Sequence, residues 1–201
     1  MQFQKTLVLI MESLGISSNE LAQRMDSDYR WIIEITTNHE WKPKLDTIFR
    51  ICYALQFDVV KFFEFVEFGV CSNNWAASMF SYDNDQLFLQ NNYNALNSDR
   101  ILETEPCHIA KAFRAFRLEA GLTQKELGQI TLFSENSISL RESIRYRNYP
   151  TTTTLRLYCS AFEISLATFI RRTFWFASMK WPKNSPETIN DTDGFKCSLV
   201  Y

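Results

Sequence analysis

The amino-acid sequence predicts an all-α fold built from two similar halves. Glycine and proline are scarce, at 5 residues each among 201, which disfavours a β fold with many tight turns. Apolar residues make up 46% of the chain and aromatic residues 15%, enough to fill packed cores. Sequence patterns typical of helix starts occur twice, 106 residues apart. These observations indicate a globular helical protein.

The two halves are related by an internal repeat of about 65 residues. The segment GISSNELA at residues 15–22 aligns with GLTQKELG at residues 121–128, an offset of 106. Further along, CYAL at residues 52–55 aligns with CSAF at residues 159–162, an offset of 107. We therefore expect one fold to occur twice, with one residue inserted in a loop.

Each repeat predicts five short helices. In the second repeat, apolar residues recur at every third or fourth position over residues 109–120 and predict an amphipathic helix that ends at Gly121. The hydroxyl of Ser134 can cap the third helix. Two further helices are expected at about residues 152–162 and 165–175, separated by a short turn.

The start of the second helix carries a capping-box pattern in both repeats. Thr123 is followed three residues later by Glu126, and Ser17 is followed by Glu20. In such a box each side chain satisfies a backbone N–H of the other residue. We expect both boxes to form.

Charge is divided unevenly along the chain. Residues 1–104 hold 8 Lys and Arg against 14 Asp and Glu, whereas residues 105–183 hold 12 against 6. A basic segment attracts nucleic acid, and an acidic one is repelled by phosphate and suits protein partners better. The two repeats are therefore expected to differ in function.

No pattern of catalytic or metal-binding residues stands out. The five cysteines include no C-x-x-C pair, and the two histidines lack the spacing of a zinc-hydrolase motif. No apolar run is long enough to span a bilayer. We expect a cytoplasmic protein with reduced thiols, without enzymatic activity, metal or cofactor.

Several segments together carry a family resemblance. They are GLTQKELG at residues 121–128, Glu142, Pro150 and AFEISL at residues 161–166. In this combination the second repeat resembles the helix-turn-helix domain of phage repressors and Cro proteins, often called Xre-like. The first repeat resembles the same family less closely. The resemblance covers about two thirds of the chain and implies a DNA-binding transcriptional regulator, such as a repressor.

The resemblance implies which residues read DNA bases. In this family the third helix enters the major groove with its first residues facing the base edges. Asparagine can pair with adenine, and glutamate can accept a hydrogen bond from cytosine. The corresponding positions here are Glu135, Asn136, Ser139 and Leu140.

Other positions are expected to contact the DNA backbone. Gln124 matches the family's phosphate-contacting glutamine, and a guanidinium fork suits phosphate oxygens. The alternative is that these are ordinary exposed polar residues. The expected backbone contacts are Gln124, Lys125, Arg145, Tyr146 and Arg147.

Family members often carry a structural ion pair between the first and third helices. Its positions are Arg117 and Glu142 in the second repeat and Met11 and Thr36 in the first. Both charges are absent from the first repeat, so no unpaired charge is expected inside it.

The sequence leaves open which residue near the end of the third helix faces the core. Arg141 stands where the first repeat has the apolar Ile35. A shift of the helix by one residue would bring Leu140 into the core instead and would move the base-contacting set.

The first repeat has lost the DNA-facing residue types. Ser18 replaces the family glutamine, and its groove-facing positions are Tyr29, Arg30 and Trp31. Aromatic residues beside acidic ones suit a protein interface better than a major groove. We interpret these residues as an interaction surface, the alternative being that Tyr29 and Trp31 pack on their own core.

The sequence thus predicts two five-helix helix-turn-helix domains joined by a connector rich in asparagine and aromatic residues. The proposed partners are double-stranded DNA, a second copy of the chain that pairs through apolar surface of the first domain or connector, and a further protein bound by the first domain. The alternative function is a protein-interaction module, antitoxin-like or inhibitory, with DNA binding secondary. The boundaries are 1–68 for the degenerate acidic domain, 69–104 for the connector, 105–180 for the basic domain and 181–201 for a tail.

Overall fold

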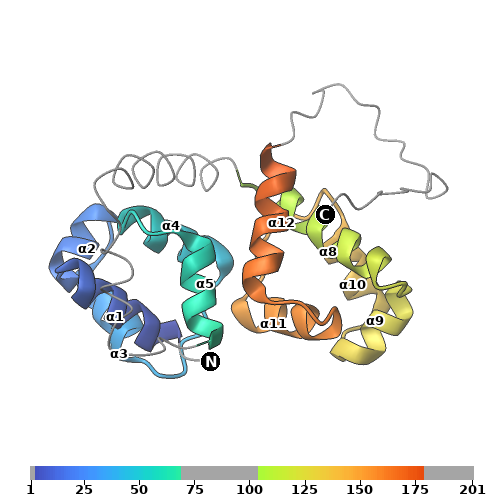
Figure 1. Ribbon diagram of the computed structural model, residues 1–201, viewed down its shortest axis with the longest axis horizontal. Helices are drawn as coiled ribbons and strands as arrows, with labels where there is room; N and C mark the ends of the chain where they lie inside the picture. The colour runs from blue at the N-terminus through green and yellow to red at the C-terminus, as the bar shows by residue number, and fades with distance from the viewer. Residues whose placement is uncertain (1–2, 69–103, 179–201) are drawn as a thin grey trace, which may run out of the picture.

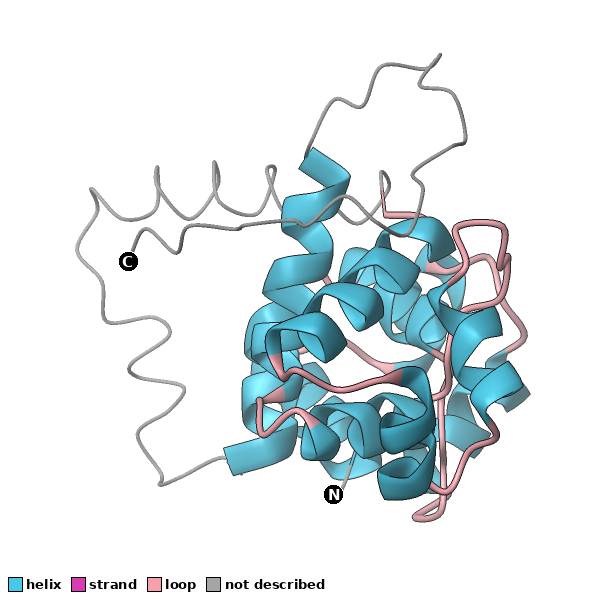
Figure 2. Cartoon of the chain, turned by 90° about the vertical axis from the view of Figure 1, so that its right-hand side faces the viewer, coloured by secondary structure: helices cyan, strands magenta, loops and turns pink. Residues whose placement is uncertain are grey.

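The computed structural model describes residues 3–68 and 104–178. All regular elements in these two stretches are α-helices, ten in number, and Figure 2 shows them joined by loops without a strand. The all-α fold is therefore confirmed for the part of the chain described. The predicted connector, apart from Thr104, and the predicted tail lie outside it.

The described residues contain five helices in each half. The first five are α1 Phe3–Leu14, α2 Ser18–Arg24, α3 Tyr29–Thr37, α4 Leu45–Ala54 and α5 Val59–Phe68. The second five are α8 Pro106–Glu119, α9 Gln124–Thr131, α10 Glu135–Glu142, α11 Thr152–Ala161 and α12 Leu166–Ser178. From α2 and α9 onward, matching helices start 106 or 107 residues apart, which is the spacing of the sequence repeat.

The two capping patterns give different structures. At α9, Thr123 and Glu126 form the complete reciprocal box. At α2, the Ser17 side chain accepts a hydrogen bond from the Glu20 backbone N–H, but the Glu20 carboxylate pairs with Arg24 at 2.6 Å. The box predicted at Ser17 and Glu20 is therefore only half formed, because the carboxylate has a cationic partner one turn along its own helix.

A close backbone approach shapes the turn between α9 and α10. A Cβ atom added to Gly128 would lie 2.6 Å from the carbonyl oxygen of Phe133, too close for any side chain. The turn itself passes through Leu132, which has a left-handed φ of 60°. In the first half, the matching residues are Ala22 and Asp26, with φ 46° at Asp26. Residue 128 thus has no room for a Cβ atom, which is why glycine stands there.

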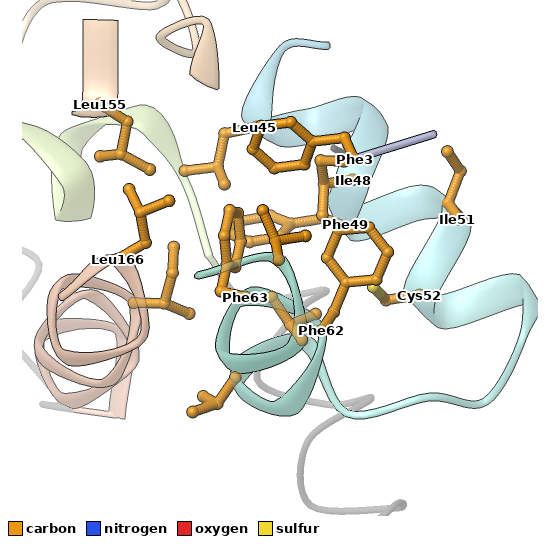
Figure 3. Packing of buried hydrophobic residues seen from close by; sticks show 14 of the residues in the cluster. Phe3, Leu45, Ile48, Phe49, Ile51, Cys52, Phe62, Phe63, Leu155 and Leu166 are labelled. Atoms are coloured by element: carbon orange, nitrogen blue, oxygen red, sulfur yellow. The ribbon is translucent and has the colours of Figure 1, made fainter. Parts of the chain in front are cut away.

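The two halves pack against each other through their last helices. Figure 1 shows α5 beside α11 and α12, and contacts join α5 to α12 directly. The Phe49 ring lies 5.8 Å from the Phe174 ring and 6.4 Å from the Tyr149 ring, measured between centroids. In Figure 3, Leu155 and Leu166 reach toward the cluster formed by residues of α4 and α5. The buried apolar residues of both halves form one continuous core.

Backbone and polar contacts also cross between the halves. The N–H of Leu45 donates to the carbonyl oxygen of Pro150 at 3.0 Å, and the N–H of Thr152 donates to that of Pro43 at 2.9 Å. These bonds join the segments that precede α4 and α11. The apolar face of α5, one of the surfaces expected to receive a second chain, is covered by α12 of the same chain.

Gly128→Ala is expected to destabilise the protein by about 1–3 kcal/mol, because the new methyl group forces the Phe133 carbonyl away from α9. Urea unfolding followed by circular dichroism measures the effect. The matched control is Ala22→Gly at the equivalent place in α2, which removes a methyl group and creates no clash. A Gly128→Ala variant as stable as the parent chain would show that the turn is not tight.

Candidate nucleic-acid interface

A buried ion pair fixes the arrangement of α8, α9 and α10. The Arg117 Nε atom donates to Glu142 Oε1 at 2.7 Å and its Nη2 atom donates to Oε2 at 2.8 Å. The side chains are only 9% and 2% exposed, respectively. The third guanidinium nitrogen donates to the Leu122 carbonyl oxygen at 2.8 Å, and Gln124 Nε2 donates to Glu142 Oε2 at 3.0 Å. One charge pair therefore joins the end of α8, the start of α9 and the end of α10.

The matching place in the first half contains no charge. Met11 and Thr36 are both buried there. The Thr36 hydroxyl is satisfied within its own helix, since it donates to the Ile32 carbonyl oxygen at 2.8 Å. Apolar packing and a local hydrogen bond thus replace the ion pair of the second half.

The start of α10 presents a polar face to solvent. Ser134 caps the helix by accepting a hydrogen bond from the Ser137 N–H, and Ile138 anchors the opposite face in the core. All four positions expected to contact bases are exposed. They are Glu135, Asn136, Ser139 and Leu140. In Figure 1, α9 and α10 lie on the side of the second half that is remote from α1–α5.

Arg141 lies at the position in α10 that matches the buried Ile35 of α3. Its guanidinium carbon lies 4.4 Å from the centre of the Phe133 ring, and its Nη1 atom donates to the Ser137 carbonyl oxygen at 3.0 Å. Leu140 is 57% exposed. The alternative register, with Leu140 in the core, is therefore wrong: the cation stacks on an aromatic face at the edge of the core and the helix does not shift.

The residues expected to contact phosphates fall into two groups. Gln124 and Lys125 form the first turn of α9, where Lys125 is exposed and Gln124 is half-buried. The loop after α10 exposes Arg145 and Arg147, while Tyr146 is half-buried. The Gln124 amide nitrogen donates to Glu142, a hydrogen bond that was not among the contacts expected from the resemblance. This bond fixes the glutamine side chain at the base of the polar face.

The excess of basic residues persists in the described parts of the two halves. Residues 104–178 hold 10 Lys and Arg against 6 Asp and Glu, and residues 3–68 hold 7 against 10. The second half therefore carries the positive charge that attracts a polyanion.

The exposed surface of α3 is smaller than the sequence indicates. Tyr29 is 46% exposed and Arg30 is exposed. Trp31, in contrast, is half-buried and packs against the core. The interaction surface expected at Tyr29, Arg30 and Trp31 thus has only its first two members in solvent.

The described residues contain no group of three His, Cys, Asp or Glu side chains arranged to hold a metal ion. Within the same stretches, no helix has the length and apolar character needed to cross a bilayer. The three cysteines there, Cys52, Cys107 and Cys159, are free thiols. Burial is the main cause that raises the pKa of each, so these thiols are poor nucleophiles at neutral pH.

No family model, curated protein or solved structure matches the chain. The geometry of α8–α12 and the motifs of the sequence are therefore the basis for a functional proposal.

Replacing one member of the buried pair is expected to be costly. Arg117→Met or Glu142→Thr leaves one charge buried without its partner, and each should lower the free energy of unfolding by about 3–5 kcal/mol. The double variant recreates the residues found at Met11 and Thr36, and should be more stable than either single variant. Urea unfolding of all three variants gives the coupling energy.

The matched control is Glu20→Thr, which breaks the exposed pair with Arg24 and should cost less than about 1 kcal/mol. Single costs that simply add in the double variant would show that Arg117 and Glu142 do not act as a pair.

Proposed function

We propose that the protein is a sequence-specific DNA-binding transcriptional regulator that reads the major groove with α10. One observation carries this proposal: α10 exposes a polar face beside basic side chains, and the buried Arg117–Glu142 pair holds that helix against α8 and α9. The rigid support matters because base recognition needs side chains placed to within a fraction of an ångström. In this proposal residues 105–180 form the DNA-binding domain.

The exposed residue types suit direct readout. Asn136 has the donor and acceptor needed to pair with the edge of an adenine, and Glu135 can accept from the amino group of a cytosine. Arg145 and Arg147 follow in the next loop, where guanidinium groups can bind phosphates and set the register of the protein on the duplex.

Residues 1–68 form, in this proposal, a second helix-turn-helix domain that has given up base reading. Its described part has more acidic than basic residues, and phosphate repels such a surface. A second candidate function follows from the same half. The exposed Tyr29 and Arg30 on α3 are residue types enriched in protein interfaces, which favours a protein partner for this domain.

The proposal is tested first with the full chain and a pool of random duplex DNA. Repeated rounds of binding and amplification should enrich one sequence motif. Failure to enrich any motif at low salt would overturn the proposal and would favour the protein-interaction function.

Asn136→Ala is expected to weaken binding to the enriched site by about 1–3 kcal/mol and to relax the preference at one base pair. Arg30→Ala, at the equivalent position of α3, is the matched control and should leave affinity unchanged. Fluorescence anisotropy with the enriched site and its single-base variants measures both effects. An equal loss on every DNA sequence would mean that Asn136 does not contact a base.

Arg147→Ala should weaken binding to all DNA sequences alike and should reduce the slope of log affinity against log salt by about one, since one phosphate contact is lost. Lys5→Ala, which removes an exposed cation from α1, is the control and should leave the slope unchanged. A change confined to one DNA sequence would contradict a backbone role for Arg147.

A further inference from the structure

The contact between the two halves is nearly two-fold symmetric. The antiparallel bridge joins Lys44 to Thr151, and these two residues are equivalent in the repeat, 107 positions apart. The two backbone hydrogen bonds that flank it run from Leu45 to Pro150 and from Thr152 to Pro43, so each half donates one bond to the same place in the other. Such reciprocal pairing of equivalent positions is the mark of a two-fold dimer interface. Here both sides belong to one chain.

One pair of side chains, on α5 and α12, occupies equivalent positions in the two halves but carries opposite charges. Glu64 of α5 forms an ion pair with Arg171 of α12, and these residues are again 107 positions apart. A residue near a two-fold axis meets its own equivalent. Two copies of the first half would therefore place Glu64 against Glu64, and two copies of the second half would place Arg171 against Arg171. Like charges disfavour both of these pairings, whereas the pairing of unlike halves is favoured.

The ends of the helices are complementary in a second way. The Glu67 carboxylate of α5 accepts a hydrogen bond from the N–H of Leu166, the first residue of α12, at 2.6 Å. Both helices also carry a local cap: Asp58 accepts from the N–H of Val60 at 2.6 Å in α5, and Ser165 accepts from the N–H of Thr168 at 3.0 Å in α12. The residue equivalent to Glu67 in the second half is Phe174, which packs on Phe49. The equivalent positions 67 and 174 therefore make different contacts with the opposite half, a hydrogen bond at one and a ring contact at the other.

We infer that the protein is a single-chain counterpart of a homodimer, in which the first half occupies the place that a second subunit would take on the basic half. Of the surfaces on which the expected homodimer could pair, the apolar face of α5 is covered by α12 of the same chain, and the connector lies outside the described residues except for Thr104. One chain already supplies both partners of the pairing, so in this inference it works as a monomer, with one chain per DNA site. The statement about DNA rests on the function proposed above, whereas the internal pairing does not.

Cysteines placed at Lys44 and Thr151 test the pairing. Directly opposed residues between two flanking hydrogen bonds have Cα atoms about 4.5 Å apart, within the range a disulfide spans. In a full-length chain with Cys71, Cys107 and Cys197 changed to Ser, oxidised glutathione should join Lys44→Cys and Thr151→Cys within one molecule. Non-reducing gel mobility and peptide mass mapping identify the product.

The matched control combines Lys44→Cys with Ser160→Cys, an exposed position at the far end of α11, and should give no internal bond. Covalent dimers from the Lys44→Cys and Thr151→Cys chain, or no disulfide at all, would overturn the inference. Light scattering of the parent chain should give the monomer mass of 23.6 kDa, and a stable dimer would also overturn it.

Exchange of charges tests the selection of unlike halves. In the chain that carries the two cysteines, Glu64→Arg or Arg171→Glu should slow internal disulfide formation about two- to fivefold at low salt, because each creates a like-charge pair. The double exchange should restore the parent rate. A double variant as slow as the single ones would overturn the role of this pair in selecting the partner.

The cross-linked monomer also separates the two proposals. When bound to the enriched DNA site, it should keep the affinity of the parent chain, with one chain per duplex by native mass measurement. A cross-linked monomer that binds no DNA, from a parent chain that also binds none, would overturn the proposed function and support the internal pairing. Binding only by two chains per site would overturn the inference and leave the proposed function standing.

Discussion

The buried ion pair of Arg117 and Glu142 is the constraint on which the second half depends. Its two parallel hydrogen bonds, and the bond from Gln124, join three helices at one point away from water. Separating a buried ion pair leaves an unpaired charge away from water, which costs several kcal/mol. The pair therefore fixes the positions of α8, α9 and α10 relative to one another. The orientation of the polar face of α10 is fixed in the same way. In the first half, apolar packing around Met11 takes the place of the ion pair. Such packing restrains the orientation of the helices less strictly than a bidentate hydrogen-bonded pair does.

The turn between α9 and α10 adds a second restraint on the same face. Gly128 allows the Phe133 carbonyl to approach α9, and the Phe133 ring in turn receives the Arg141 guanidinium. A left-handed residue is needed in this turn, and the chain uses Leu132, which is 91% exposed. A branched side chain in that conformation is strained relative to glycine. The turn is therefore held by the contacts on either side of it and not by the local preference of its own residues.

Much of the fold could be predicted from the sequence because its signals are local. The caps at Thr123 and Ser134 mark helix starts, and the positions of Arg117 and Glu142 follow from the resemblance. One expectation failed, and one open alternative was excluded, where a local rule met a competing contact. The Glu20 carboxylate pairs with Arg24 one turn away, so the capping box at Ser17 is incomplete. The Arg141 guanidinium stacks on the Phe133 ring, so α10 does not shift to bury Leu140.

The contact between the halves could not be predicted, because it joins residues about a hundred positions apart and no local pattern records it. One signal was nevertheless present. At the equivalent positions Glu64 and Arg171 the repeat carries opposite charges, which two identical subunits cannot arrange across a two-fold axis. Recognising such a pair requires knowledge of which helix faces lie near the axis, and the alignment alone does not supply it.

If the chain is a single-chain counterpart of a homodimer, as inferred above, the joining of both halves accounts for their divergence. In a homodimer every substitution near the axis appears twice and must be compatible with itself. Within one chain, the halves meet at an effective concentration set by the connector, so a weak interface is enough to keep them paired. The two halves can then carry different side chains at equivalent positions. The basic half retains the buried ion pair and the polar face of α10, while the acidic half retains the fold and covers the apolar side of α12. Under the proposed function only one half has to meet phosphate, and this division accounts for the asymmetry of charge along the sequence.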